Sequence, residues 1–220
     1  MSPRLSNMIS ASEALALLRE GNQRFVAHQS EAVATMNPAR RTELVSGQAP
    51  FAIVLGCSDS RVPAELVFDQ GLGDLFVIRV AGNIVAPSQI GSVEFAAERF
   101  GTRLVVVMGH SQCGAVMATL EVVLGNATTE SRNLKSIVDL VRPSIEEMLE
   151  DREETDPDVL IHEAVRANVR ASVNHLRHGS ELLEELIQKD GLLIVGAEYS
   201  LESGIVTFLD GIPESAKEPE

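Results

Sequence analysis

The sequence has no tryptophan, one tyrosine, two cysteines and few basic residues among its 220 positions. Its 18 Lys and Arg residues face 32 Asp and Glu residues, which gives a formal net charge of -14 at pH 7. Binding to nucleic acid or to an anionic membrane surface usually requires clustered Lys and Arg. The shortage of basic residues therefore argues against both classes of partner and indicates a soluble surface that repels copies of itself.

Long apolar runs are also missing. No stretch approaches the ~18 apolar residues of a membrane span, and residues 1–8 lack the continuous apolar segment of a secretory signal. These absences predict a cytoplasmic protein without a membrane segment. The two cysteines, Cys57 and Cys113, could form one disulfide, but a reducing compartment makes metal ligation the favoured interpretation.

The patterns that are present predict an α/β protein. With 45% hydrophobic residues, the chain can bury a substantial core and is expected to form one domain over residues 1–220, with an N-terminal helical arm at 1–47 and a frayed tail at 213–220. Short apolar runs alternate with helical periodicity, which predicts a mostly parallel central sheet flanked by helices on both faces. Strands are expected at 51–56, 75–80, 104–108, 192–197 and, at the edge, 204–209. Helices are expected at 12–27, 37–47, 64–68, 88–100, 114–124, 134–150, 157–177 and 180–190.

The first helix carries an apolar stripe that needs a partner. Leu15, Leu18, Asn22 and Phe25 recur on one helical face, and Ser12 is the expected N-cap. This stripe packs either on the chain's own sheet or on a second subunit, and the sequence leaves both arrangements open.

Two of the predicted strands lead into residues with metal-binding side chains. The run 51–56 is followed by Cys57, and the run 104–108 is followed shortly by His110 and Cys113. Ligands gather outside the carboxyl ends of parallel strands, so the three side chains are expected to converge, with Cys113 one turn after His110 if a helix starts there. Two thiolates and one imidazole suit Zn²⁺, and three protein ligands leave a fourth tetrahedral position for water or substrate. We therefore expect one catalytic zinc ion per subunit.

The segments around these residues resemble the β-class carbonic anhydrases. The matching motifs are Cys-Ser-Asp-Ser-Arg-Val-Pro-Ala-Glu at 57–65, Phe-Val-Ile-Arg-Val-Ala-Gly-Asn at 76–83, Gly-Ser-Val-Glu-Phe-Ala at 91–96 and Gly-His-Ser-Gln-Cys-Gly-Ala-Val at 109–116. The resemblance implies the fold of that family and the reversible hydration of carbon dioxide to bicarbonate and a proton. It also implies a homodimer or homotetramer in which the N-terminal helical arm lies across a dimer partner.

For individual residues the resemblance implies two further roles. Gln48 is expected to hydrogen-bond substrate across the dimer interface, and Asp59 is expected to take the fourth zinc position in an inactive, closed state favoured at lower pH. Some family members also have a non-catalytic bicarbonate pocket built from Trp, Arg and Tyr. The matching places here hold Val54, Arg79 and Tyr199, so the missing tryptophan argues against that pocket. Arg79 is then expected to pair with a buried carboxylate.

The residues next to the ligands suggest how such a site would work. A bidentate Arg61 would keep Asp59 ionised and oriented, and this carboxylate can accept the proton of zinc hydroxide and aim its oxygen at a carbonyl carbon. The amide of Gly114, at a helix start, is expected to stabilise a carbonate oxygen. An apolar wall for carbon dioxide is expected from Val62, Ile84 and Val85. The proton shuttle cannot be assigned, since His28, His162, His175 and His178 qualify only by residue type.

Two alternatives to carbon dioxide hydration stay open. The same zinc hydroxide could attack another heterocumulene, such as carbon disulfide or carbonyl sulfide. A different class is a non-enzymatic zinc or redox module, in which Cys57 and Cys113 serve structure or sensing. That class predicts that loss of Asp59 or Arg61 leaves function intact while metal removal unfolds the chain.

Overall fold

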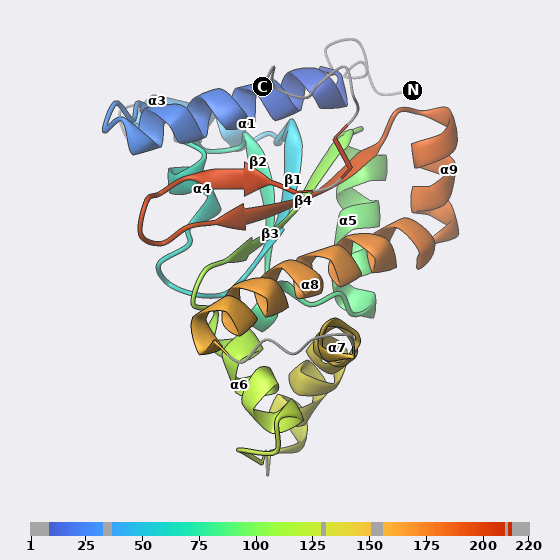
Figure 1. Ribbon diagram of the computed structural model, residues 1–220. Coiled ribbons are helices and arrows are strands. Elements are labelled where there is room, and N and C mark those ends of the chain that lie inside the picture. The colour runs from blue at the N-terminus through green and yellow to red at the C-terminus, as the bar shows by residue number, and fades with distance from the viewer. Residues whose placement is uncertain (1–8, 33–36, 129–130, 151–155, 210, 213–220) are drawn as a thin grey trace.

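A computed structural model describes residues 9–32, 37–128, 131–150, 156–209 and 211–212, and the predicted tail at 213–220 lies outside them. Its sheet has five strands in the order β2-β1-β3-β4-β5. The first four are parallel and β5 runs antiparallel to β4, so the mostly parallel sheet is confirmed (Figure 1). The strands are β1 (Ala52–Gly56), β2 (Leu75–Arg79), β3 (Leu104–His110), β4 (Leu193–Tyr199) and β5 (Val206–Phe208). The helices are α1 (Ala11–Val26), α3 (Pro38–Leu44), α4 (Ala64–Val67), the 3₁₀ turn η2 (Ala81–Asn83), α5 (Pro87–Arg99), α6 (Gly114–Val123), α7 (Arg132–Leu149), α8 (Pro157–His178) and α9 (Glu181–Lys189).

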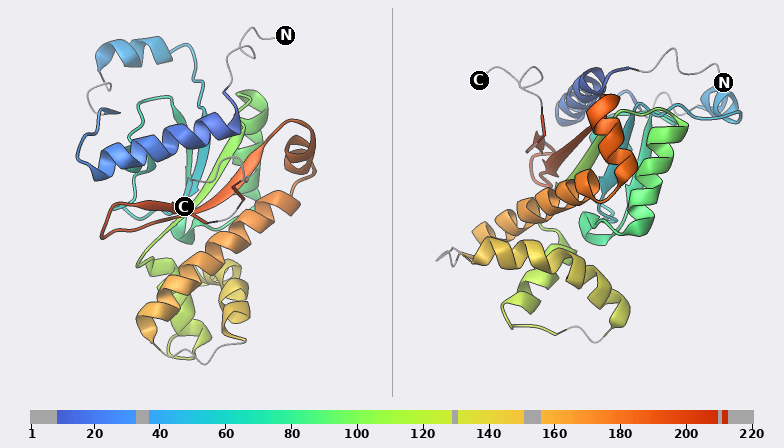
Figure 2. Two further views of the ribbon diagram at one scale, coloured as in Figure 1. Left: turned by 45° about the horizontal axis from the view of Figure 1, so that its top comes forward. Right: turned by 90° about the vertical axis from the view of Figure 1, so that its right-hand side faces the viewer.

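The central strands are buried along their whole length. Every residue of β1 and β3 is buried, as expected for β-branched and aliphatic runs that are covered on both faces of a parallel sheet. Alternate side chains enter two cores, one under α1 and α4 and the other under α5, α8 and α9. Figure 2 shows α6 and α7 packed against α8 at the far side from α1, where they enclose a third apolar cluster. This third cluster contains both cysteines.

Helix α1 covers the chain's own sheet. Leu15 and Leu18 are fully buried in the core beneath it, and Asn22 bonds the carbonyls of Val67 and Gly204 and the amide of Val206. The stripe predicted from the sequence is therefore satisfied within the subunit. By contrast, α3 has no buried residue, although Arg40 on it bonds the carbonyl of Leu72 and the carboxylate of Asp74.

Two local predictions need correction. Ser10, not Ser12, caps α1, and its side chain forms a capping box with Glu13. The strand β3 continues through His110, since its pairing with β4 extends to Tyr199, so His110 and Cys113 are not one helical turn apart.

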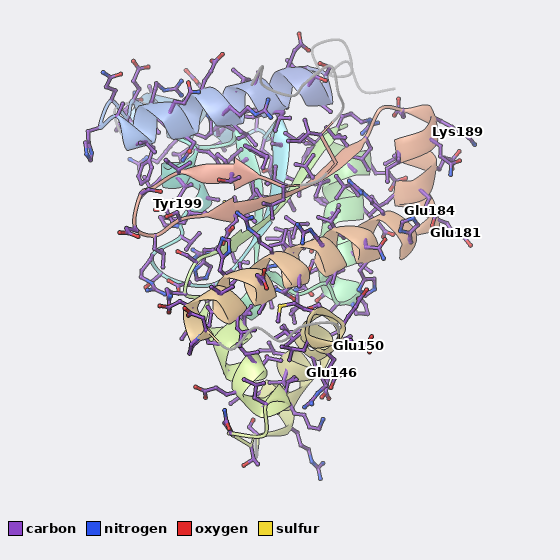
Figure 3. All side chains as sticks on the ribbon, viewed as in Figure 1. Glu146, Glu150, Glu181, Glu184, Lys189 and Tyr199 are labelled. Carbon is purple, nitrogen blue, oxygen red and sulfur yellow. The ribbon has the colours of Figure 1, made fainter. Side chains whose placement is uncertain are left out.

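Acidic side chains lie on the outer side of two helices. Figure 3 shows the side chains of Glu146 on α7, of Glu150 just after it, and of Glu181 and Glu184 on α9 pointing away from the sheet. No helix in the described part of the chain is long and apolar enough to cross a membrane.

Candidate metal centre

Three side chains meet where β1 and β3 end. Cys57 directly follows β1, His110 is the last residue of β3, and Cys113 is the N-cap of α6. The two strands are neighbours in register, with Gly56 opposite Met108, so their carboxyl ends lie side by side. The two sulfur atoms and a ring nitrogen lie within 4.8 Å of one another, and all three residues are buried. The geometry brings together the residues that the sequence nominated as ligands.

The state of the His110 ring fits metal binding. Its Nδ1 lies 2.9 Å from the carbonyl oxygen of Ser111, and a carbonyl can only accept, so Nδ1 carries the hydrogen. The lone pair is then on Nε2, which is buried and has no hydrogen-bond partner among the described residues. A buried acceptor without a hydrogen-bond partner costs stability. A cation bound to His110 Nε2 and the two neighbouring sulfurs would remove that cost. The donor set of two sulfurs and one imidazole nitrogen suits Zn²⁺, as the sequence predicted.

The two thiols behave as a coupled pair. Their sulfur atoms are 3.9 Å apart. The hydrogen bond with Cys113 lowers the pKa of Cys57, aided by the amide of Gly82 and opposed by burial. The same hydrogen bond and burial raise the pKa of Cys113. The pair loses its first proton easily and its second with difficulty, because adjacent buried thiolates repel each other, and a divalent cation between them removes that repulsion.

Asp59 and Arg61 form a bidentate ion pair beside the cluster. Arg61 Nε donates to Asp59 Oδ1 over 2.9 Å, and its Nη2 donates to Oδ2 over 2.7 Å. These bonds hold the pKa of Asp59 well below its usual range. Arg61 also donates to the carbonyl of Gln112 over 3.3 Å, which links this loop to the segment between the other two ligands. Asp59 Oδ2 lies 3.8 Å from His110 Nε2, so an ionised carboxylate faces the edge of the cluster.

Arg79 supports the ligand loop in a way the sequence did not reveal. The expected pairing with a buried carboxylate is wrong, because its guanidinium donates instead to the carbonyls of Cys57, over 2.9 Å, and Asp59, over 2.5 Å. A forked cation that holds two carbonyls fixes the path of the chain between a ligand and the ion pair. The hydrophobic periodicity of the sequence cannot indicate this contact, because it depends on which backbone carbonyls lie next to Arg79 at the end of β2.

The other residues predicted for the site are not among the three candidate ligands. Gln48 is exposed in the segment between α3 and β1. Gly114 opens α6, and a side-chain carbon added to it would have nothing within 4 Å, so there is open space beside its backbone. Ile84 shares the apolar cluster of Cys57 and Cys113, whereas Val62 and Val85 belong to the cores on opposite faces of the sheet. The three residues expected to form one apolar wall therefore belong to three different clusters.

Of the remaining sequence candidates, Tyr199 is paired with His110 between β4 and β3, whereas His162 lies elsewhere. His162 pairs with Glu198 at 3.4 Å and lines a cavity of about 720 Å³ between α7 and α8, which neither cysteine nor His110 lines. Val54 and Tyr199 are both buried in the core under α1 (Figure 3 labels Tyr199).

An open α/β sheet with two thiols and one imidazole at its carboxyl edge defines an α/β protein with a site that could hold a metal ion. A family model described as carbonic anhydrase matches residues 52–206. Carbonic anhydrase 2 of Mycobacterium tuberculosis is 38% identical over 205 residues, covering 91% of this chain and 94% of that protein.

Solved structures show the same fold. A β-carbonic anhydrase of Aspergillus fumigatus matches with a TM-score of 0.72 at 28% identity, covering 93% of each chain. A structure from a pair of tetrameric β-carbonic anhydrases of Sordaria macrospora matches with a TM-score of 0.71 at 24% identity, covering 90% of this chain and 97% of that one. The chain belongs to the β-carbonic anhydrase family.

Proposed function

We propose that this protein catalyses the zinc-dependent, reversible hydration of carbon dioxide to bicarbonate and a proton. The observation that carries the proposal is the buried, unpartnered Nε2 of His110, which faces two thiols and lies next to an ionised carboxylate in the described part of the chain. Membership of the β-carbonic anhydrase family supports the same reaction.

Cys57, His110 and Cys113 would hold one zinc ion per subunit, with a fourth position facing Asp59. Zinc bound there supplies a nucleophile at neutral pH, because the cation lowers the pKa of a water ligand toward ~7. The side chains around that position would orient the reacting groups and contact the substrate.

Asp59 is the group proposed to orient the attacking oxygen. Arg61 bonds both of its carboxylate oxygens, so Asp59 stays ionised and accepts a hydrogen bond without competing for the hydrogen itself. Accepting that bond fixes the direction in which the oxygen's lone pair points. In a closed state at lower pH, Asp59 would itself occupy the fourth position, and Arg61 opposes this by holding both oxygens.

Carbon dioxide fits the surroundings of the site. It is small and uncharged, and Ile84 offers a buried apolar contact in the cluster that contains both cysteines. The amide of Gly114, at the start of α6 with open space beside it, would donate to an oxygen of the product as negative charge develops. Gln48 is exposed within its own subunit, which suits a role in the site of a partner in a dimer or tetramer.

Stopped-flow carbon dioxide hydration, with zinc quantified in the same sample, tests the proposal. We expect activity that depends on zinc and falls about 100-fold in Asp59→Asn and Arg61→Ala, because both lose the oriented carboxylate. Asp139→Asn is the control, since it breaks an exposed ion pair with Lys135 on α7. Full activity in the two site variants would contradict the role proposed for Asp59 and Arg61. Zinc-loaded wild type that hydrates no carbon dioxide would favour the non-enzymatic module, and turnover of carbon disulfide without carbon dioxide hydration would favour the other heterocumulene.

A further inference from the structure

The turn η2 lies directly against one of the candidate ligands. The amide nitrogen of Gly82 donates to Cys57 Sγ over 3.4 Å. Two consecutive residues of this turn, Gly82 and Asn83, have positive φ values of 71° and 42°. Such a backbone is disfavoured, above all for Asn83, and keeps its shape only where surrounding contacts impose it. The direction of the Gly82 N–H group therefore depends on whatever holds the turn.

Helix α8 supplies the contacts that hold the turn. Asn168 Nδ2 donates to the carbonyl of Gly82 over 2.8 Å, and Ser172 Oγ donates to the carbonyl of Asn83 over 3.1 Å. Asn168 and Ser172 are one helical turn apart and both buried, at 2% and 5% exposure. The two side chains thus fix both left-handed residues from the same face of one helix.

The same face of α8 also meets the strand that carries His110. A side-chain carbon added at Gly109 would come within 2.6 Å of Val169 Cγ2 and 3.2 Å of Val165 Cγ1, so the helix and strand are in close contact there. Such close packing leaves α8 little freedom to shift along β3. The helix is consequently a rigid support shared by the Cys57 and His110 sides of the cluster.

We propose that Asn168 is a positioning residue for the metal centre, which aims the Gly82 N–H group at the Cys57 sulfur. A hydrogen bond to a coordinating thiolate stabilises its negative charge and limits the charge it gives to the cation. A Cys57 sulfur fixed in this way would hold zinc more tightly, and the hydrogen bond would leave more of the charge of the cation available to activate water. Ser172 assists by holding Asn83. This inference deepens the proposed function and rests on it.

The test compares Asn168→Leu with wild type in two measurements on folded protein. The first is zinc affinity by competition with a chelator, and the second is the thiolate-to-metal charge-transfer band of the cobalt-substituted protein. We expect Asn168→Leu to bind zinc about 10-fold more weakly and to shift the band, because outer-shell partners typically change metal affinity by about 10–100-fold. Ser172→Ala should change both quantities in the same direction by less, and it keeps the test valid if Asn168→Leu does not fold.

Asn22→Leu is the matched control. Asn22 is also a buried asparagine that bonds backbone carbonyls, but these belong to Val67 and Gly204 on the far side of the sheet. It should lower the melting temperature without moving zinc affinity or the charge-transfer band. If Asn22→Leu alters both metal readouts as much as Asn168→Leu, or if the Asn168 and Ser172 variants alter neither, the inference is overturned while the zinc site stands. Failure of wild type to bind zinc would instead overturn the proposed function.

Discussion

The packing of α1 on its own sheet predicts a large effect for one small substitution, Gly21→Ala. A side-chain carbon at Gly21 would lie 1.8 Å from the carbonyl oxygen of Phe68 and 2.8 Å from its carbonyl carbon. These are backbone atoms that cannot rotate away, so α1 has to move outward by roughly 1.5 Å to restore an ordinary separation of roughly 3.5 Å. The next residue, Asn22, makes its three hydrogen bonds to Val67, Gly204 and Val206 over 3.0, 2.9 and 2.9 Å, and none survives such a displacement.

The expected cost follows from those bonds. At about 1 kcal/mol each, three lost hydrogen bonds amount to about 3 kcal/mol, from which the helix propensity of alanine returns about 0.5–1 kcal/mol. Gly21→Ala should therefore lower the free energy of unfolding by about 2–2.5 kcal/mol, measured by urea denaturation followed by far-ultraviolet circular dichroism.

Gly91→Ala provides the matched comparison. Gly91 lies within α5, is exposed, and has nothing within 4 Å of an added side-chain carbon. This variant should gain about 0.5–1 kcal/mol, since alanine is the better helix former. If Gly21→Ala unfolds at the same urea concentration as Gly91→Ala, then α1 does not lie against Phe68 as described, and the account of this core is refuted.

Two further predictions concern stability away from the metal centre. Ser10→Ala should lower the free energy of unfolding by about 1 kcal/mol, measured by thermal unfolding, because it removes the N-cap of α1. Ser12→Ala should change it by less than about 0.5 kcal/mol. Equal effects of the two substitutions would contradict the assignment of Ser10 as the cap. Burial raises the pKa of Asp69. The hydrogen bonds from the amide of Ala32 and the guanidinium of Arg24 lower it by more than burial raises it, so the pKa of Asp69 lies below the ordinary value. Its stabilising contribution is present above about pH 4 and is lost as pH falls through the lowered pKa. Asp69→Asn should therefore flatten the acid side of a stability-against-pH curve, and an unchanged acid side would count against this contribution.

The parts of the fold visible in the sequence are those encoded by local pattern. The runs leading to Cys57 and His110 are unbroken and apolar, so their burial as neighbouring parallel strands could be inferred. The convergence of Cys57, His110 and Cys113 followed from that inference, because parallel strands present their carboxyl ends together. Asn22 in an otherwise apolar stripe was likewise a visible sign of a polar contact beneath α1.

The parts that sequence reasoning missed depend on non-local backbone geometry. Arg79 was assigned a carboxylate partner, yet it holds two carbonyls whose position is set only once β1 and β2 are aligned. The extension of β3 through His110 comes from pairing with β4, not from the apolar pattern, which ends before it. The hydrogen bonds from Asn168 and Ser172 to the turn η2 have one sign in the sequence. These two small polar residues are four positions apart on the buried face of a long helix.

X-ray absorption spectroscopy of the zinc-loaded protein tests the central claim most directly. We expect two sulfur ligands at about 2.3 Å, one imidazole nitrogen at about 2.0 Å and one further light-atom ligand, with one zinc per chain. His110→Ala should lose the imidazole contribution to the spectrum. A metal site with no sulfur ligands, or fully folded protein in which Cys57 and Cys113 are joined to each other, would contradict the account.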